Sequence, residues 1–255
     1  MVDRYTVTVS TPGPMGATNA YVVGETDGLL IDPAGWQPEL AAACAGTVSH
    51  VAVTHHHPDH VGGVKQYASE YDLTVWARAG RENAFETATG VHPDRSYYPG
   101  EQLPAAGGVE VLDTPGHAPE HTAFGVADGV LTGDSVVAEG SVAVAAPEGD
   151  MRAYLSSLRR LAARDPARLY PGHGPLVDTP RESCERLLEH RLDRESRIRE
   201  AVEAGARTVS EIVDSAYEKD VSAVRNLAAA TVIAHLEKLV VESDIAWDGE
   251  YAVPR

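Results

Sequence analysis

The chain has 255 residues, and a hydrophobic content of 43% is enough for a folded core, which excludes global disorder. No stretch approaches the roughly 20 apolar residues that a membrane-spanning helix needs. The N-terminus lacks the basic and then apolar pattern of a secretory signal. The two cysteines, Cys44 and Cys184, lie far apart and suit a reducing interior better than a disulfide framework. We therefore expect a cytoplasmic protein with no membrane partner and two free thiols.

The charge is strongly acidic. The formal net charge is -17, from 38 acidic and 21 basic residues, and only Lys65, Lys219 and Lys238 are lysines. Such a composition is typical of halophilic proteins, because salt screens the repulsion between surface carboxylates. An acidic protein from a high-GC genome is the alternative explanation.

Short apolar runs separated by turns predict strands along the first 180 residues. These strands are expected over residues 5–10, 20–23, 29–31, 51–54, 73–77, 109–113, 123–126, 129–131 and 168–170. Helical spacing predicts helices over residues 38–45, 62–71 and 151–163. Strands and helices are therefore both expected in this part of the chain.

The last 76 residues have a different organisation. Thr179, with Pro180 next and Glu182 at the third position, predicts a capped helix that runs to about residue 204. Thr208 and Glu211 repeat this pattern, and a third helix is expected over residues 222–241. Short strands at 245–247 and 251–253 flank an Asp-Gly turn. We interpret residues 180–255 as a winged-helix-like domain that follows a catalytic domain over residues 1–179.

Potential metal ligands follow four of the predicted strands, at the point where each strand ends. The first cluster, THHHPDH, contains His55, His56, His57, Asp59 and His60. Three further segments, TPGH, LTGD and YPGHG, contain His117, Asp134 and His173. Rigid strands can aim loop side chains at one point, so we expect these residues to converge.

The ligand types fit two metal ions. Zinc favours about four nitrogen or oxygen ligands, with one position left to water in catalytic sites. One predicted set is His55, His57 and His117, the other is Asp59, His60 and His173, and Asp134 would bridge both. Two ions lower the pKa of a bridging water and supply a hydroxide near neutral pH. His56 is expected to turn away, as a supporting or substrate-facing residue. Asp32 could orient a metal-bound histidine or cap its own turn.

Together, THHHPDHVGG, TPGH, LTGD and YPGHG resemble the metallo-β-lactamase superfamily. The resemblance implies an αββα sandwich and the metal roles assigned above, with Asp59 orienting the nucleophile as the catalytic residue. It implies two zinc ions, with iron or manganese as alternatives. In GHAPEHT, Ala118 and Glu120 depart from the commoner GHTPGHT. His121 is expected to support the loop of His117.

The C-terminal segments HRLDRESRIREAVEAG and AAATVIAHLEKL resemble the β-lactamase-like protein 2 group of that superfamily, which implies endoribonuclease activity on single-stranded RNA. From Arg181 onward there are 11 basic and 16 acidic residues, which argues against sequence-specific DNA binding. The exception would be a basic strip formed by Arg191, Arg194, Arg197 and Arg199, although a solvated, ion-paired face explains them better.

Three functions remain open. A dinuclear hydrolase could cleave single-stranded RNA, as the resemblance implies, although an acidic surface weakens phosphate binding. It could instead hydrolyse a small thioester or lactone, in the manner of glyoxalase II, which needs no basic groove. A metal-sensing regulator is the non-enzymatic alternative.

Overall fold

The computed structural model describes residues 1–10 and 16–255, which form two compact units, each with its own core. The first unit comprises Met1–Thr114, Glu120–Gly140 and Pro166–Pro180. The second comprises Pro115–Pro119, Ser141–Asp165 and Arg181–Arg255.

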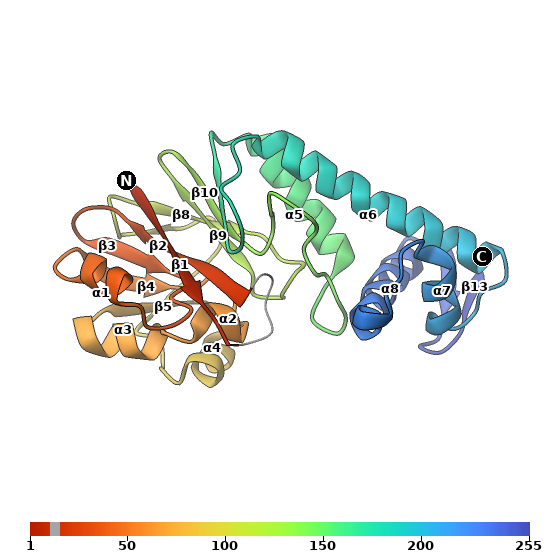
Figure 1. The fold of residues 1–255 in the computed structure, drawn as a ribbon, viewed down its shortest axis with the longest axis horizontal. Coiled ribbons are helices and arrows are strands. Elements are labelled where there is room, and N and C mark those ends of the chain that lie inside the picture. The colour runs from red at the N-terminus through yellow and green to blue at the C-terminus, as the bar shows by residue number, and fades with distance from the viewer. Residues whose placement is uncertain (11–15) are drawn as a thin grey trace. The chain divides into compact units, whose positions relative to one another are not determined.

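The first unit contains two sheets (Figure 1). The larger has the order β1-β2-β3-β4-β5-β6, in which β1, β2 and β3 pair antiparallel and β3 to β6 pair parallel. Its strands are β1 (Val2–Thr8), β2 (Ala17–Val23), β3 (Gly28–Ile31), β4 (Val48–Ala52), β5 (Thr74–Arg78) and β6 (Arg95–Tyr97). Every residue of β3 is buried, as its apolar GLLI sequence predicts for a central strand.

The smaller sheet has the order β11-β10-β9-β8-β7. Its strands are β7 (Gln102–Leu103), β8 (Val109–Asp113), β9 (Thr122–Val126), β10 (Gly129–Gly133) and β11 (Leu169–Pro171). The pairing of β9 with β10 is antiparallel, as expected for strands joined by the Asp128-Gly129 turn, and β11 joins parallel to β10.

The two sheets pack face to face over a shared core. Leu29 and Ile31 of the larger sheet belong to the same buried cluster as Val111, Phe124 and Leu131 of the smaller one. A second cluster lies between the larger sheet and the helices on its outer side, and includes Leu40 and Tyr67. The helices of this unit are α1 (Pro38–Cys44), α2 (Pro58–Val61), α3 (Val64–Tyr71) and α4 (Glu82–Thr89). The expected α/β architecture is thus confirmed.

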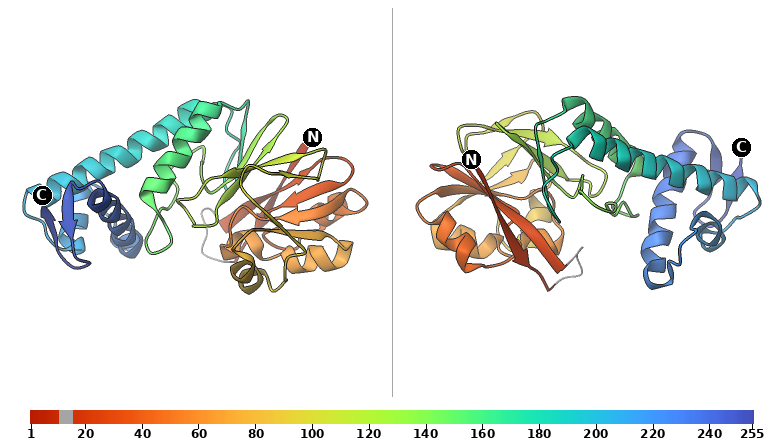
Figure 2. Two further views of the ribbon diagram at one scale, coloured as in Figure 1. Left: turned by 180° about the vertical axis from the view of Figure 1, so that it is seen from behind. Right: turned by 45° about the horizontal axis from the view of Figure 1, so that its top comes forward.

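The second unit is mainly helical. Its elements are α5 (Met151–Arg164), α6 (Pro180–Glu203), α7 (Val209–Ala216), the 3₁₀ turn η2 (Ser222–Val224), α8 (Arg225–Val241), β12 (Ile245–Trp247) and β13 (Ala252–Pro254). The C-terminal end of α6 packs with α7, α8 and the β12–β13 hairpin around Ile198, Val202, Ile212 and Leu236 (Figure 2). The predicted capping box at the start of α7 is present, since Thr208 and Glu211 exchange both hydrogen bonds.

Several expectations about these elements are confirmed, and some elements were not predicted. Cys44 and Cys184 are free and buried. The helix α4 and the short strands β6 and β7 had no clear pattern in the sequence. In the part of the chain that the structure describes, no helix is both long and apolar enough to cross a membrane. The winged-helix-like interpretation and the domain division at residue 180 stay predictions.

Candidate metal centre

The histidine cluster follows β4, where the chain turns into the short helix α2. His57 occupies the N-cap position in extended backbone, and Pro58 is the first helical residue, which ends the strand-like conformation abruptly. Two glycines allow the turn after α2 to lie against the β3 loop. A Cβ on Gly62 or Gly63 would come within 2.4 or 2.6 Å of the carbonyl oxygens of Ala34 and Pro33. The short helix therefore places Asp59 and His60 on the far side of a tight turn from His55.

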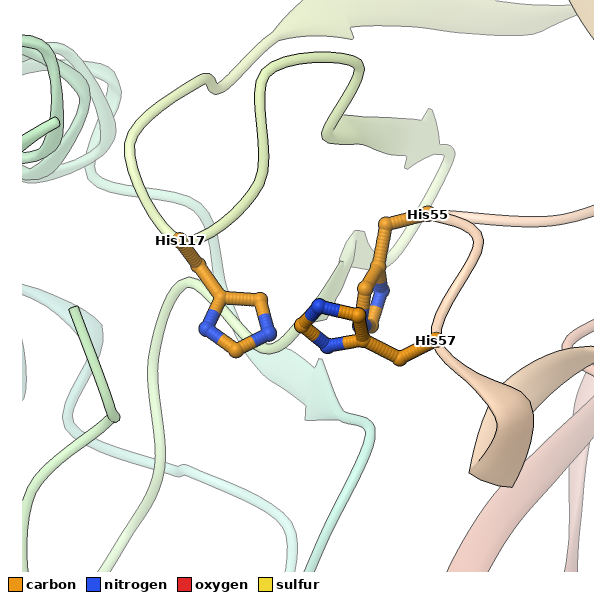
Figure 3. Close-up of side chains that lie close together, drawn as sticks. All are labelled: His55, His57 and His117. Carbon is orange, nitrogen blue, oxygen red and sulfur yellow. The ribbon is translucent and has the colours of Figure 1, made fainter. Parts of the chain in front are cut away.

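The structure brings the predicted ligands together. In each of three groups the ligand atoms lie within 4.8 Å of one another: His55, His57 and His117; His55, His60 and Asp134; Asp59, His60 and His173. Figure 3 shows the imidazoles of the first group directed toward one another from two loops. The first and third groups coincide with the two predicted sets, and the second places Asp134 with a member of each.

Asp134 lies beside the histidines of the third group. Its Oδ1 atom is 3.5 Å from Nε2 of His60, and its Oδ2 atom is 3.4 Å from Nε2 of His173. Asp59 Oδ2 is 3.5 Å from the same His173 nitrogen. All four residues are buried. One carboxylate therefore presents its two oxygens to two imidazoles of the same predicted set.

Hydrogen bonds on the outer side of the histidines fix which nitrogen faces the cluster. Nδ1 of His117 lies 2.6 Å from the carbonyl oxygen of Ala143, and Nδ1 of His173 lies 2.8 Å from that of Ala17. A carbonyl oxygen only accepts, so each Nδ1 carries the proton and donates. In a neutral imidazole the lone pair is then on Nε2, which is the form that binds a metal.

A buried chain of hydrogen bonds through Asp32 does the same for two other histidines. Asp32 Oδ2 lies 3.0 Å from Nδ1 of His60 and accepts from Oγ1 of Thr54 at 2.8 Å. Because that hydroxyl proton is already donated, Thr54 Oγ1 accepts from Nδ1 of His55, 3.0 Å away. Asp32 also accepts the backbone N–H of Thr54 at 2.7 Å. Of the two roles considered for Asp32, the structure shows that it orients histidines.

These contacts test whether the residues fit a cation. Nε2 of His60 and Nε2 of His173 are only 3.3 Å apart. Two lone pairs at that distance repel each other unless a proton or a metal cation lies between or beside them. Burial lowers the pKa of His60, but Asp134 and Asp32 raise it by more, so its pKa lies well above the usual value. Asp134 and the Ala17 carbonyl likewise outweigh burial at His173 and raise its pKa. The donor set therefore fits divalent metal ions.

Comparison with known proteins agrees with this geometry. A family model described as the metallo-beta-lactamase superfamily matches residues 13–173. The chain belongs to that superfamily.

Individual relatives of this superfamily member share most of its length. A beta-lactamase-like protein 2 homolog of Drosophila melanogaster is 28% identical over 249 residues, which cover 89% of this chain and 84% of the relative. An atrochrysone carboxyl ACP thioesterase of Aspergillus fumigatus is 29% identical, over 73% of this chain and 61% of that protein. A crystal structure of a metallo-beta-lactamase family protein from Thermus thermophilus has a TM-score of 0.78 at 25% identity, and covers 100% of this chain and 98% of the other.

The loop that carries His117 is held by α5. Gly116, with φ of +136°, accepts the N–H of Asp150 at 2.8 Å, and Ser157 donates to the Pro115 carbonyl at 2.8 Å. A Cβ on Gly116 would lie 2.3 Å from the Cα of Tyr154, so only glycine fits there. The TPGH segment therefore needs its glycine to bring the loop against the first turn of α5.

Glu120 explains one departure from the commoner superfamily pattern. Its Oε1 atom accepts the backbone N–H of His56 at 3.0 Å and lies 3.6 Å from Nδ1 of the same histidine. The His56 ring packs edge-on against Phe85, with centroids 5.6 Å apart. His56 is therefore a supporting residue, and Glu120 holds the backbone between His55 and His57. In the sequence, the signal for this contact is Glu120 itself, an acidic residue where the commoner pattern GHTPGHT has glycine.

His121 supports more than the loop of His117. Its Nδ1 atom is 2.9 Å from Oγ1 of Thr114, where that loop begins, as expected. Its Nε2 atom also accepts the N–H of Asp134 at 3.1 Å, and its ring stacks on His55 with centroids 5.1 Å apart. One buried imidazole thus connects two of the ligand loops, which sequence spacing could not indicate.

The four arginines of α6 do not form a basic strip. Arg191 is buried and donates to the Val142 carbonyl. The guanidinium of Arg194 lies 3.6 Å above the Tyr217 ring and donates to the Ala216 carbonyl. Arg197 pairs with Glu218 at 3.1 Å, and Arg199 with Asp244 at 3.9 Å. The ion-paired explanation therefore holds for the last two, whereas the first two stabilise the packing of the second unit.

Proposed function

We propose that this chain is a hydrolase that uses two divalent metal ions. One ion would be held by His55, His57 and His117, the other by Asp59, His60 and His173, with Asp134 between them. The observation that carries the proposal is the 3.3 Å approach of the His60 and His173 Nε2 atoms, whose Nδ1 atoms are both committed to outer partners. Zinc suits this nitrogen and oxygen set, and iron or manganese are alternatives.

A bound pair of such ions supplies a hydroxide nucleophile near neutral pH and stabilises negative charge that develops on the substrate. The chain itself fixes the geometry, because Asp32, Ala17 and Ala143 hold the histidine rings from behind. Asp59 orients the attacking water and accepts its proton. Its buried carboxylate reaches the cluster from α2, with Oδ2 3.5 Å from His173 Nε2.

We favour a small acyl compound, a thioester or lactone, as the substrate. The net charge of -17 opposes a polyanion. The α6 arginines, which offered the best chance of a basic groove, are engaged within the second unit. Similarity to the thioesterase of Aspergillus fumigatus supports acyl chemistry.

Single-stranded RNA is the second candidate. Similarity to the beta-lactamase-like protein 2 homolog extends over 89% of this chain and therefore into its C-terminal part, whose resemblance implies endoribonuclease activity. In that case the winged-helix-like domain would guide the RNA. High salt would weaken the repulsion between an acidic surface and phosphate.

The test compares both substrates on one preparation. Metal-depleted protein is reconstituted with zinc, then assayed on a thioester and on labelled single-stranded RNA, in dilute buffer and in molar KCl. Asp59→Asn should abolish hydrolysis, while Asp72→Asn, which alters an exposed aspartate, should leave it unchanged. Full activity in Asp59→Asn would contradict the role of Asp59 in hydrolysis. If the parent cleaves RNA and Asp59→Asn does not, the result would favour the second candidate.

A further inference from the structure

The second unit contains a cavity of about 570 Å³ beside the loop of His117. Small-molecule sites commonly have volumes of roughly 300–1,000 Å³. Much of the wall is formed by Pro115 and Pro119 of the loop, Pro147 before α5, Met151 at the start of α5, and Ala234 and Val241 of α8. The cavity is therefore large enough for an organic group, and its lining is mainly apolar.

The charged groups around the cavity do not favour a phosphate. Three carboxylates, Glu148, Asp150 and Glu237, line it together with the cations Arg152 and Lys238. The Lys238 ammonium already donates to Glu195 at 2.7 Å and to Glu242 at 2.5 Å. Burial and the neighbouring Asp150 raise the pKa of Glu237, and the three carboxylates outnumber the two cations in the lining.

The cavity shares part of its wall with the loop that carries His117. The loop residues on both sides of His117 contribute to the cavity wall. The same loop is fastened to α5 through the bond from the Asp150 N–H to the Gly116 carbonyl. A group bound in the cavity would therefore lie against the loop that carries His117.

We propose that this cavity binds the uncharged, apolar acyl chain of the substrate, next to the metal ligand His117. The inference rests on the proposed hydrolase function and narrows its substrate to acyl compounds with an extended apolar group. In the hydrolysis of such a thioester, the oxygen of water bonds to the carbonyl carbon, the carbon–sulfur bond breaks, and a proton passes to the leaving sulfur. The products are a carboxylic acid and a thiol.

The test changes the cavity without touching the metal ligands. Val241 lines the cavity yet is 63% exposed, so Val241→Trp should fold and fill part of the volume. Leu227→Trp is the matched control, because Leu227 lies on the same helix, is 46% exposed and does not line the cavity. Acetyl and octanoyl esters of one thiol serve as substrates.

We expect Val241→Trp to lower the octanoyl-to-acetyl ratio of kcat/KM about tenfold, which corresponds to about 1.4 kcal/mol. Leu227→Trp should leave the ratio unchanged. An unchanged ratio in both variants would overturn the cavity proposal and leave the hydrolase function intact. If the parent cleaves single-stranded RNA and Val241→Trp cleaves it more slowly, the cavity proposal is also overturned, because the cavity would then bind a polyanion.

A binding measurement separates this proposal from the proposed function. Calorimetry uses an unreactive octanoyl analogue in which a methylene stands between carbonyl and sulfur. If the zinc-loaded parent hydrolyses neither thioester but binds the analogue, and Val241→Trp weakens that binding, the cavity proposal stands and the hydrolase proposal fails. If the analogue does not bind the parent, the cavity proposal fails.

Discussion

Replacing Asp32 with Asn changes one charge at the centre of the hydrogen-bond network behind the histidines. Asp32 is 1% exposed and has a left-handed φ of +51°, which Asn also tolerates. Its Oδ2 atom contacts both Thr54 Oγ1 and His60 Nδ1. An amide NH₂ at that position would face two donors, so the His60 ring would shift its proton to Nε2. The nitrogen that faces the cluster would then lose its lone pair.

The magnitude follows from these contacts. Loss of an outer partner of a metal-bound histidine typically weakens metal binding about 10- to 100-fold. That range corresponds to about 1.4–2.8 kcal/mol. If the amide turns the other way, its NH₂ faces the Thr54 N–H instead. That buried N–H then has lost its acceptor, which lowers the free energy of unfolding by about 1–3 kcal/mol. Both orientations of the Asn side chain are therefore unfavourable.

The assay is zinc affinity by competition with a chromophoric chelator, together with urea unfolding of the metal-free protein. Asp27→Asn is the matched control. Asp27 lies just before β3, whereas Asp32 lies just after it, and Asp27 also has a left-handed φ of +50°. The Asp27 carboxylate, however, is largely exposed and contacts His50. The control should bind zinc as the parent does. Parent-like zinc affinity in Asp32→Asn would refute the orienting role of this carboxylate.

Three further variants test separate contacts. Gly116→Ala should destabilise the protein by about 3 kcal/mol, because the new Cβ overlaps the backbone of α5. Gly46→Ala is the control, because Gly46 also has a positive φ, of +72°, but open space around it, and it should cost about 1 kcal/mol in the same urea titration. Glu120→Ala should weaken zinc binding about tenfold, whereas Glu120→Gln, which keeps an acceptor for the His56 N–H, should bind zinc as the parent does. If Glu120→Ala binds zinc as tightly as the parent, Glu120 does not support the metal ligands. Glu195→Gln should cost about 1.5 kcal/mol at pH 7, since buried Lys238 then loses one of its two carboxylate partners and keeps Glu242. Burial raises the pKa of Glu195, but its hydrogen bonds lower it by more, so this stabilisation is present above about pH 4.3 and is lost as the pH falls through the lower folded pKa. A difference between parent and Glu195→Gln that stays constant in acid would contradict that reasoning.

Much of the candidate site could be predicted from local pattern. An apolar strand followed at once by a polar loop is visible in the sequence, and the loops after β4, β8, β10 and β11 place the expected residues together. The division of ligands into two sets also agrees with the observed groups. Each ligand loop is recognisable from residues close together in the chain, although the two sets join loops that are far apart in sequence.

The supporting contacts could not be predicted in this way. Asp32 and Thr54 are 22 positions apart, and Glu120 and His56 are 64 apart, so their pairing depends on the packing of strands and loops. The strand β7 has two residues and no alternation, and its place is set by its neighbour β8. The charge of Arg191 suggested an exposed face, whereas tertiary packing buries it.

Metal stoichiometry measured together with activity tests the central claim most directly. Metal-depleted protein receives zinc in increments, and bound zinc per chain is determined by elemental analysis while thioester and RNA hydrolysis are followed on the same samples. The account predicts that binding saturates at two ions per chain and that hydrolysis of one substrate rises with the second ion. Hydrolysis by metal-free protein, or full activity with one ion bound, would contradict it.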